Sequence, residues 1–156
     1  MITIEIPGRN RLKLEHLVMD FNGTVAVNGE LIPGLAEKLI LISKKIKVHI
    51  LTADTFGTAR KALEGLDLIV SLVEKENQSA SKSDYITGLN EKKVVAIGNG
   101  LNDNLMLKNA ALGIVVIEGE GASFASIQNA DIVSKSIHDA LDLLIYPLRI
   151  TATLRN

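Results

Sequence analysis

The sequence has no cysteine and no tryptophan, and aromatic residues make up only 3% of its 156 residues. Without cysteine, the chain has no disulfide, no thiolate metal site and no cysteine nucleophile. So few aromatic rings argue against a platform that stacks nucleic-acid bases. The net charge of −1 shows no basic excess, so we expect neither nucleic acid nor an anionic membrane surface as a partner.

Long apolar runs are also missing. No window approaches the ~18 uninterrupted apolar residues of a membrane span. The first 13 residues alternate apolar with polar side chains, unlike the apolar core of a signal peptide. We therefore expect a cytoplasmic protein without a membrane segment. The values of 47% hydrophobic and 22% charged residues are ordinary for globular proteins, and the length suits one domain, residues 1–156.

Strand and helix patterns alternate along the chain. Short apolar runs predict buried parallel strands at 17–19, 48–51, 68–70, 94–97, 112–117 and 131–133. Between these strands, side chains repeat at helical spacing, which predicts helices at 35–44, 58–63, 82–89, 102–109, 123–129 and 138–145. The polar stretch 74–81 predicts a loop. This alternation predicts an α/β fold, a three-layer, Rossmann-like, doubly wound parallel sheet.

The N-terminal residues, about 1–15, predict a strand or a hairpin outside this alternation. Residues 2–6 alternate like a strand, and residues 12–14 are placed to pair back with them. A sheet edge and a subunit interface are the other pairing sites that the pattern leaves open.

Ligands of doubly wound sheets bind at the carboxyl ends of the strands, so polar residues there are the candidates for chemistry. The first such segment is Asp20-Phe-Asn-Gly-Thr24. Asp20 would project into the crevice, and Gly23 permits a tight loop with N–H groups turned toward an anion. The same residues are also typical of a plain turn closed by an Asp side chain.

Two further segments have weaker signals. Thr52, in Leu51-Thr-Ala-Asp54, ends a strand, and its hydroxyl could bind a phosphoryl oxygen or cap the next helix; Asp54 competes for the cap. Lys82 is either a solvated charge or a cation that offsets phosphate and carboxylate charge.

The segment Gly98-Asn-Gly-Leu-Asn-Asp103 is more specific. Two glycines let the backbone approach a ligand, and Asp103 falls in the first turn of a predicted helix. Carboxylate and carbonyl oxygens suit a hard cation. The alternative is a helix start at which Asp103 only complements the helix dipole.

In order and spacing, these four segments resemble the haloacid dehalogenase (HAD) superfamily of aspartate-nucleophile phosphohydrolases. The likeness is strongest to the phosphorylation domain of P-type ion-transporting ATPases. That domain carries Asp-Lys-Thr-Gly-Thr and Gly-Asp-Gly-x-Asn-Asp, where this chain has Asp20-Phe-Asn-Gly-Thr24 and Gly98-Asn-Gly-Leu-Asn-Asp103. The resemblance spans residues 12–149, without the nucleotide-binding insert and membrane helices of the pumps. It implies a free-standing, capless HAD-like domain.

The resemblance also implies roles for individual residues. Asp20 would be the nucleophile that forms an aspartyl-phosphate, and Thr52 and Lys82 would hold the phosphoryl group and stabilise its charge. The phosphate-binding set would be Asn22, Gly23, Thr24, Thr52, Ala53 and Lys82. Mg²⁺ would bind Asp20, the backbone carbonyl of Asn22, Asn99 and, directly or through water, Asp103.

Two residues depart from the family pattern. Phosphatases of the superfamily have an Asp general acid/base two residues after the nucleophile, where this chain has Asn22. Asn99 replaces an Asp metal ligand, which leaves two carboxylates in the implied metal site instead of three. We therefore expect slow turnover, limited by hydrolysis of the acyl phosphate. The alternative is a weak or inactive relative that binds a phospho-ligand or a partner protein.

Too few residues separate the motifs for a cap domain, so the site should be open. A phospho-macromolecule, or a small phosphate ester enclosed by a homo-oligomer, would both fit such a site. We expect His49 to be a hydrogen-bonded core residue and assign no role to His16 or His138. A dinucleotide-binding domain is a poorer match, because no Gly-x-Gly-x-x-Gly follows the first buried strand.

Overall fold

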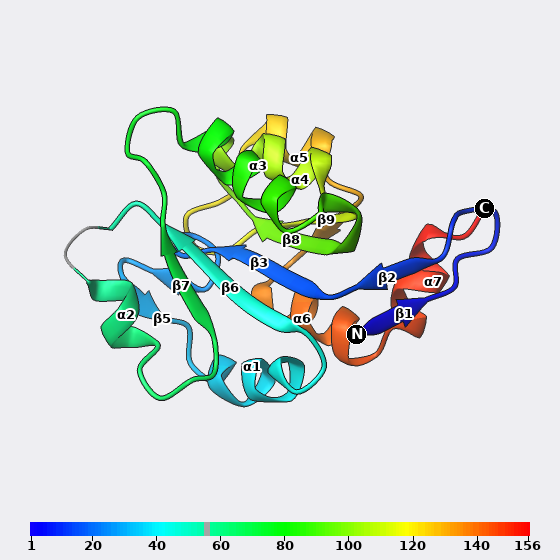
Figure 1. The fold of residues 1–156 in the computed structure, drawn as a ribbon, viewed down its shortest axis with the longest axis horizontal. Coiled ribbons are helices and arrows are strands. Elements are labelled where there is room, and N and C mark those ends of the chain that lie inside the picture. The colour runs from blue at the N-terminus through cyan, green and yellow to red at the C-terminus, as the bar shows by residue number, and fades with distance from the viewer. Residues whose placement is uncertain (55–56) are drawn as a thin grey trace.

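The computed structural model describes residues 1–54 and 57–156 (Figure 1). Within these residues, six parallel strands form a central sheet in the order β10-β9-β8-β3-β6-β7. They are β3 (His16–Asp20), β6 (Lys47–Thr52), β7 (Ile69–Leu72), β8 (Val94–Gly98), β9 (Leu112–Val116) and β10 (Ile132–Ser134). The strand at the centre, β3, pairs with β6 on one side and β8 on the other. The predicted doubly wound parallel sheet is confirmed.

Helices cover both faces of this sheet (Figure 1). On one face lie α1 (Leu35–Ser43), α2 (Thr58–Ala62) and α6 (Ile137–Ile145), and on the other lie α3 (Gln78–Gly88), α4 (Asn104–Asn109) and α5 (Phe124–Asn129). Alternate residues of β3 face opposite ways, so Leu17 and Met19 join one buried cluster and Val18 joins the other. The strands are therefore buried on both faces, as their continuous apolar runs predict.

The N-terminal hairpin forms as predicted. β1 (Ile2–Ile4) pairs antiparallel with β2 (Leu12–Leu14), and helix α7 (Leu148–Leu154) packs beside it at one end of the molecule (Figure 1). The Thr151 hydroxyl joins the two by donating to the Glu5 carbonyl at 2.8 Å. The first strand ends at Ile4 rather than at residue 6.

A second small hairpin follows the central strand and was not predicted. β4 (Ala26–Val27) pairs antiparallel with β5 (Glu30–Leu31). Between them, Asn28 and Gly29 both have positive φ, 53° and 81°. An Asn-Gly pair is the strongest short-range signal for such a turn, so the sequence carried this information.

The structure corrects two further predictions. Helix α3 begins at Gln78, inside the stretch that we expected to be a loop to residue 81. Its first turn is polar because it borders the open site, so no apolar periodicity marks its start. Helix α7 was not expected as a separate element. In the described part of the chain, no helix is long and apolar enough to cross a membrane.

Candidate active site

The candidate site lies at the carboxyl ends of three adjacent strands. Asp20 is the last residue of β3, Thr52 is the last of β6, and Gly98 is the last of β8. The chain builds β6 and β7 on one side of β3 and then returns to build β8 on the other. Strand order therefore reverses at β3, where doubly wound sheets leave a crevice for ligands.

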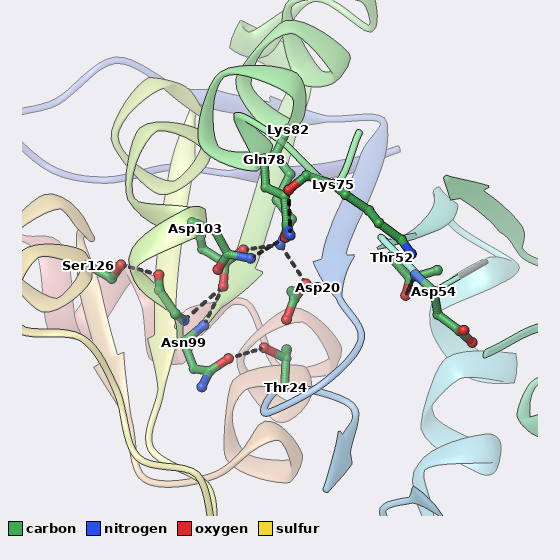
Figure 2. Close-up of polar contacts among 12 residues, drawn as sticks. Asp20, Thr24, Thr52, Asp54, Lys75, Gln78, Lys82, Asn99, Asp103 and Ser126 are labelled. Carbon is green, nitrogen blue, oxygen red and sulfur yellow. Dashed lines mark hydrogen bonds and ion pairs between the residues drawn. The ribbon is translucent and has the colours of Figure 1, made fainter. Parts of the chain in front are cut away.

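Lys82 joins two of the predicted residues in a buried ionic cluster. Its ammonium Nζ lies 2.6 Å from Asp20 Oδ1 and 2.7 Å from Asp103 Oδ1, and Lys82 is fully buried. Figure 2 shows Lys82 reaching from α3 between the two carboxylates. A buried lysine is rarely found without such partners, so the alternative of a solvated charge is wrong.

Asp103 also holds the loop after β8. Its Oδ2 accepts hydrogen bonds from the backbone N–H groups of Asn99 and Gly100, each at 2.9 Å. A Cβ on Gly98 would overlap the Asp103 carboxyl group, so this close approach requires glycine. The Ser126 hydroxyl donates to the Gly100 carbonyl at 2.6 Å from the neighbouring helix α5. Both Asp103 oxygens are thus engaged within the protein.

Burial and the neighbouring charges shift the pKa values of this cluster. Burial, and then repulsion from Asp103, raise the pKa of Asp20 to about 7, although Lys82 acts in the opposite direction. Burial by itself would lower the pKa of Lys82, but Asp20 and Asp103 outweigh it and raise that pKa. Two carboxylates face one ammonium, so the site favours an added positive charge.

The loop after Asp20 supports Asn99. The Gly23 N–H donates to the Ala26 carbonyl at 2.7 Å, which closes the loop on itself instead of turning this donor toward an anion. The Thr24 hydroxyl donates to Asn99 Oδ1 at 3.3 Å, and Asn99 Nδ2 donates to the Gly121 carbonyl at 2.9 Å. A Cβ on Gly23 would overlap the Asn99 amide group. Gly23 and Thr24 therefore position Asn99 rather than line the opening.

A polar cavity of about 400 Å³ opens above these residues. Five of the predicted residues line it: Asp20, Asn22, Thr52, Ala53 and Asn99. Four further lining residues were not predicted to belong to the site: Asp54, which we considered only as a helix cap, Gln78, Asn102 and Glu120. Glu120 follows the end of β9, so the rule that selected Asp20 and Thr52 would have found it.

The segment after Thr52 holds the start of α2. The Asp54 backbone N–H donates to Thr52 Oγ1 at 3.1 Å, and Asp54 Oδ2 accepts from the Ala59 N–H at 3.3 Å. Asp54, rather than Thr52, thus bonds to the first turn of the helix. Thr52 Oγ1 keeps its proton for another acceptor and lines the cavity.

The oxygen donors around the cavity suit a hard divalent cation. Asp20 offers a carboxylate, and Asn22 and Asn99 offer neutral carbonyl or amide oxygens, which are ligand types that Mg²⁺ accepts. Across residues 1–54 and 57–156, no group of three His, Cys, Asp or Glu side chains is placed to hold a metal. The residues therefore fit Mg²⁺ with little negative charge from the protein.

The three histidines lie outside the site. His49 is buried, and its two ring nitrogens lie 3.0 Å from His16 Nδ1 and 2.9 Å from the Tyr85 hydroxyl, so the expectation of a hydrogen-bonded core residue is confirmed. His16, to which we assigned no role, is its partner. His138 contacts the Pro33 carbonyl at 2.9 Å.

Comparison with known proteins begins with two short archaeal sequences. No protein-family model matches the chain. The uncharacterized protein MJ0073 of Methanocaldococcus jannaschii is 58% identical over 65 residues, which cover 42% of this chain and 70% of that protein. The uncharacterized protein MJ0072 of the same organism is 36% identical over 39 residues, 25% of this chain and 89% of that protein. The chain belongs to the family of these two proteins.

Solved structures identify the fold of this chain. A magnesium- and phosphate-bound 3-deoxy-D-manno-octulosonate 8-phosphate phosphatase from Moraxella catarrhalis superposes with a TM-score of 0.69, at 14% identity, over 89% of this chain and 90% of that one. A cobalt-bound phosphatase of the same name from Haemophilus influenzae gives 0.70, at 12% identity, over 92% and 94%. Because other matches are named HAD hydrolases, the fold is that of the HAD superfamily, as the motifs predict.

One relative is a transporter. The copper-transporting ATPase ccc2 of Schizosaccharomyces pombe is 35% identical over 89 residues, which are 56% of this chain but only 10% of the ATPase. This partial match is consistent with the resemblance to P-type ATPases. It covers too little of that protein to carry over its transport activity.

Proposed function

We propose that the chain is a Mg²⁺-dependent phosphohydrolase in which Asp20 forms an aspartyl-phosphate. The observation that carries the proposal is the buried Asp20–Lys82–Asp103 cluster, at 2.6 and 2.7 Å, below a polar cavity at the point where strand order reverses. The HAD fold, shared with proteins named as phosphatases, supports the same assignment.

Each residue has a role that follows from its position. Asp20 is a buried lining residue of the cavity and attacks phosphorus, which splits hydrolysis into two easier steps. Lys82 stabilises negative charge on Asp20 and on the phosphoryl group. The Thr52 hydroxyl donates to a phosphoryl oxygen, and Asn22 and Ala53 complete the wall on which the phosphoryl group rests.

The same proposal assigns a magnesium site to Asp20, the Asn22 carbonyl and Asn99. When bound, Mg²⁺ would supply charge neutralisation and orientation of the phosphoryl group. Asp103 contributes negative charge beside this site; because its oxygens are engaged, it would reach the metal through water or after losing a backbone bond. Gly23 and Thr24 act indirectly, by holding Asn99.

The substrate is a phosphate ester. The open cavity suits either a phospho-group on a macromolecule or a small ester that a second subunit of a homo-oligomer encloses. The phosphatases with the same fold are named for small phosphate esters, which favours the second arrangement.

The first test is hydrolysis of p-nitrophenyl phosphate and acetyl phosphate by the wild type beside Asp20→Ala. We expect slow hydrolysis that is lost in EDTA and in D20A, because both the nucleophile and the metal are needed. Activity that survives in D20A would refute the mechanism.

A second candidate function is binding without turnover. Asn22 and Asn99 favour it, because the first transfers no proton and the second brings no charge to the metal. In that case Mg²⁺ with beryllium fluoride would raise the melting temperature of the wild type by ligand linkage, while neither phosphate compound would be hydrolysed.

A further inference from the structure

Hydrolysis of a phosphorylated Asp20 needs a group that accepts a proton from water. The amide of Asn22 cannot do so, and a general base contributes ~10²–10⁴-fold to such a step. We infer that Glu120 is this general base. The inference rests on the proposed phosphohydrolase activity and adds the residue that sets the lifetime of the phosphoenzyme.

Glu120 is held at the mouth of the cavity by elements on two sides. Its Oε1 accepts a hydrogen bond from the Asn28 backbone N–H at 3.4 Å, at the turn of the β4–β5 hairpin. A Cβ on Gly119 would lie 3.4 Å from Val27 Cγ1 of the same hairpin. On the other side, Asn99 donates to the Gly121 carbonyl at 2.9 Å. The loop between β9 and α5 therefore forms a wall of the site, and Glu120 lines it.

The other carboxylates of the site are already engaged. Asp20 is the nucleophile, and Asp103 is fully buried with both oxygens bonded. Asp54 bonds to the Ala59 N–H at the first turn of α2. Glu120 is exposed, and its 3.4 Å contact is long enough for a water molecule to compete with it.

The position of Glu120 suits the direction of attack. Phosphoryl transfer places the attacking and leaving oxygens in line, so water must approach the phosphorus from the side opposite Asp20. Both residues line the cavity, but Asp20 is buried and Glu120 is exposed, so Glu120 lies where water enters from solvent. The water oxygen bonds to phosphorus, the bond to the Asp20 oxygen breaks with its electron pair, and the water proton passes to the Glu120 carboxylate. Asp20 is regenerated as a carboxylate, and inorganic phosphate leaves.

Pre-steady-state hydrolysis of p-nitrophenyl phosphate with Mg²⁺ separates the two chemical steps. We compare the wild type with Glu120→Gln and with a control, Glu30→Gln, which changes a carboxylate on the adjacent β4–β5 hairpin that does not line the cavity. The initial burst of nitrophenolate reports formation of the phosphoenzyme, and the steady state reports its hydrolysis. Acid-quenched samples measure the phosphoenzyme directly.

We expect E120Q to keep the wild-type burst while its steady-state rate falls by on the order of 10²-fold or more. Phosphoenzyme should accumulate, and hydroxylamine, which attacks the acyl carbon of Asp20 without a general base, should release its phosphate once and leave Asp20 as a hydroxamate. E30Q should behave as the wild type.

Two results would overturn the inference alone: an E120Q steady state equal to that of E30Q, or a loss of burst and steady state together, which indicates a structural role. In both cases a wild-type burst that is abolished by D20A would leave the proposed function standing. A wild type that forms no phosphoenzyme would overturn both.

Discussion

Lys82 is the residue on which the charges of the site depend. Its ammonium is buried between two carboxylates that come from strands and loops far apart in the sequence. Removing one partner of a buried ionic group leaves an uncompensated charge, which costs much more than the loss of a surface pair. The same chain offers a surface pair for comparison, Lys93 with Glu15 at 2.9 Å, in which both side chains are about 40% exposed.

These two lysines give a matched prediction. Lys82→Met should lower the free energy of unfolding by about 3–5 kcal/mol, because Asp20 and Asp103 then face each other without a cation. Lys93→Met should lower it far less, because water screens that pair. Urea denaturation measures both values. Equal losses in the two variants would show that the cluster is not held together by its charge.

At the scale of elements, the site depends on how closely helix α4 approaches strand β9. A Cβ on Gly113, the second residue of β9, would overlap the Leu107 carbonyl oxygen of α4. Helix α4 follows directly after the loop that Asp103 holds, so its distance from the sheet also sets the position of that loop. An added methyl group would have to push the helix away from the sheet.

Gly113→Ala should therefore destabilise the protein by about 1–3 kcal/mol. Gly88→Ala is the control, because Gly88 ends α3 and a Cβ there meets nothing within 4 Å. Since alanine favours helix over glycine, G88A should be neutral or stabilise by up to about 1 kcal/mol. Melting temperatures compare the two. A G113A protein as stable as the wild type would show that α4 can shift without cost.

At the scale of the whole molecule, a polar chain crosses one face of the sheet. His16 of β3 bonds to His49 of β6, His49 bonds to Tyr85 of α3, and the Tyr85 hydroxyl lies 3.0 Å from Ser71 Oγ of β7. Burial, and then the nearby charges of His16 and Lys47, lower the pKa of His49 to about 4. Burial likewise lowers the pKa of His16.

This lowered pKa predicts how stability depends on pH. In the unfolded chain the pKa of His49 is the ordinary histidine value of 6.5, so the contribution of neutral, buried His49 to stability is complete above that pH. As the pH falls from 6.5 toward 4, the unfolded chain takes up a proton that the folded protein excludes, and stability is lost. Asp20, with its raised pKa, changes stability in the opposite direction. Asp20 is present in both the wild type and a His49 variant, so its effect cancels when the stabilities of the two proteins are compared.

His49→Asn should be less stable than the wild type at pH 7, because it loses ring contacts. Its free energy of unfolding should fall less steeply between pH 6.5 and 4. Urea unfolding at several pH values gives both curves. Parallel curves would mean that His49 does not titrate as its burial implies.

The sequence by itself determined which segments form the sheet and where the site lies on it. Apolar runs and helical spacing are local signals, and the rule that ligands bind at strand ends turns them into a location. Asp20, Thr52 and Asn99 were found in this way, and they line one cavity. The Asn28-Gly29 turn could also have been predicted from its sequence, although it was not.

Only the tertiary structure decided which side chains meet. Lys82 and Asp20 are 62 residues apart, and His16 and His49 are 33 apart. Glu120 reaches the site because its loop packs between the β4–β5 hairpin and Asn99. Such contacts depend on strand order and register across the whole sheet. Strand order and register in turn depend on burying the hydrophobic clusters on both faces of the sheet. No local pattern contains that information, because hydrophobic burial is non-directional and is satisfied only by the complete fold.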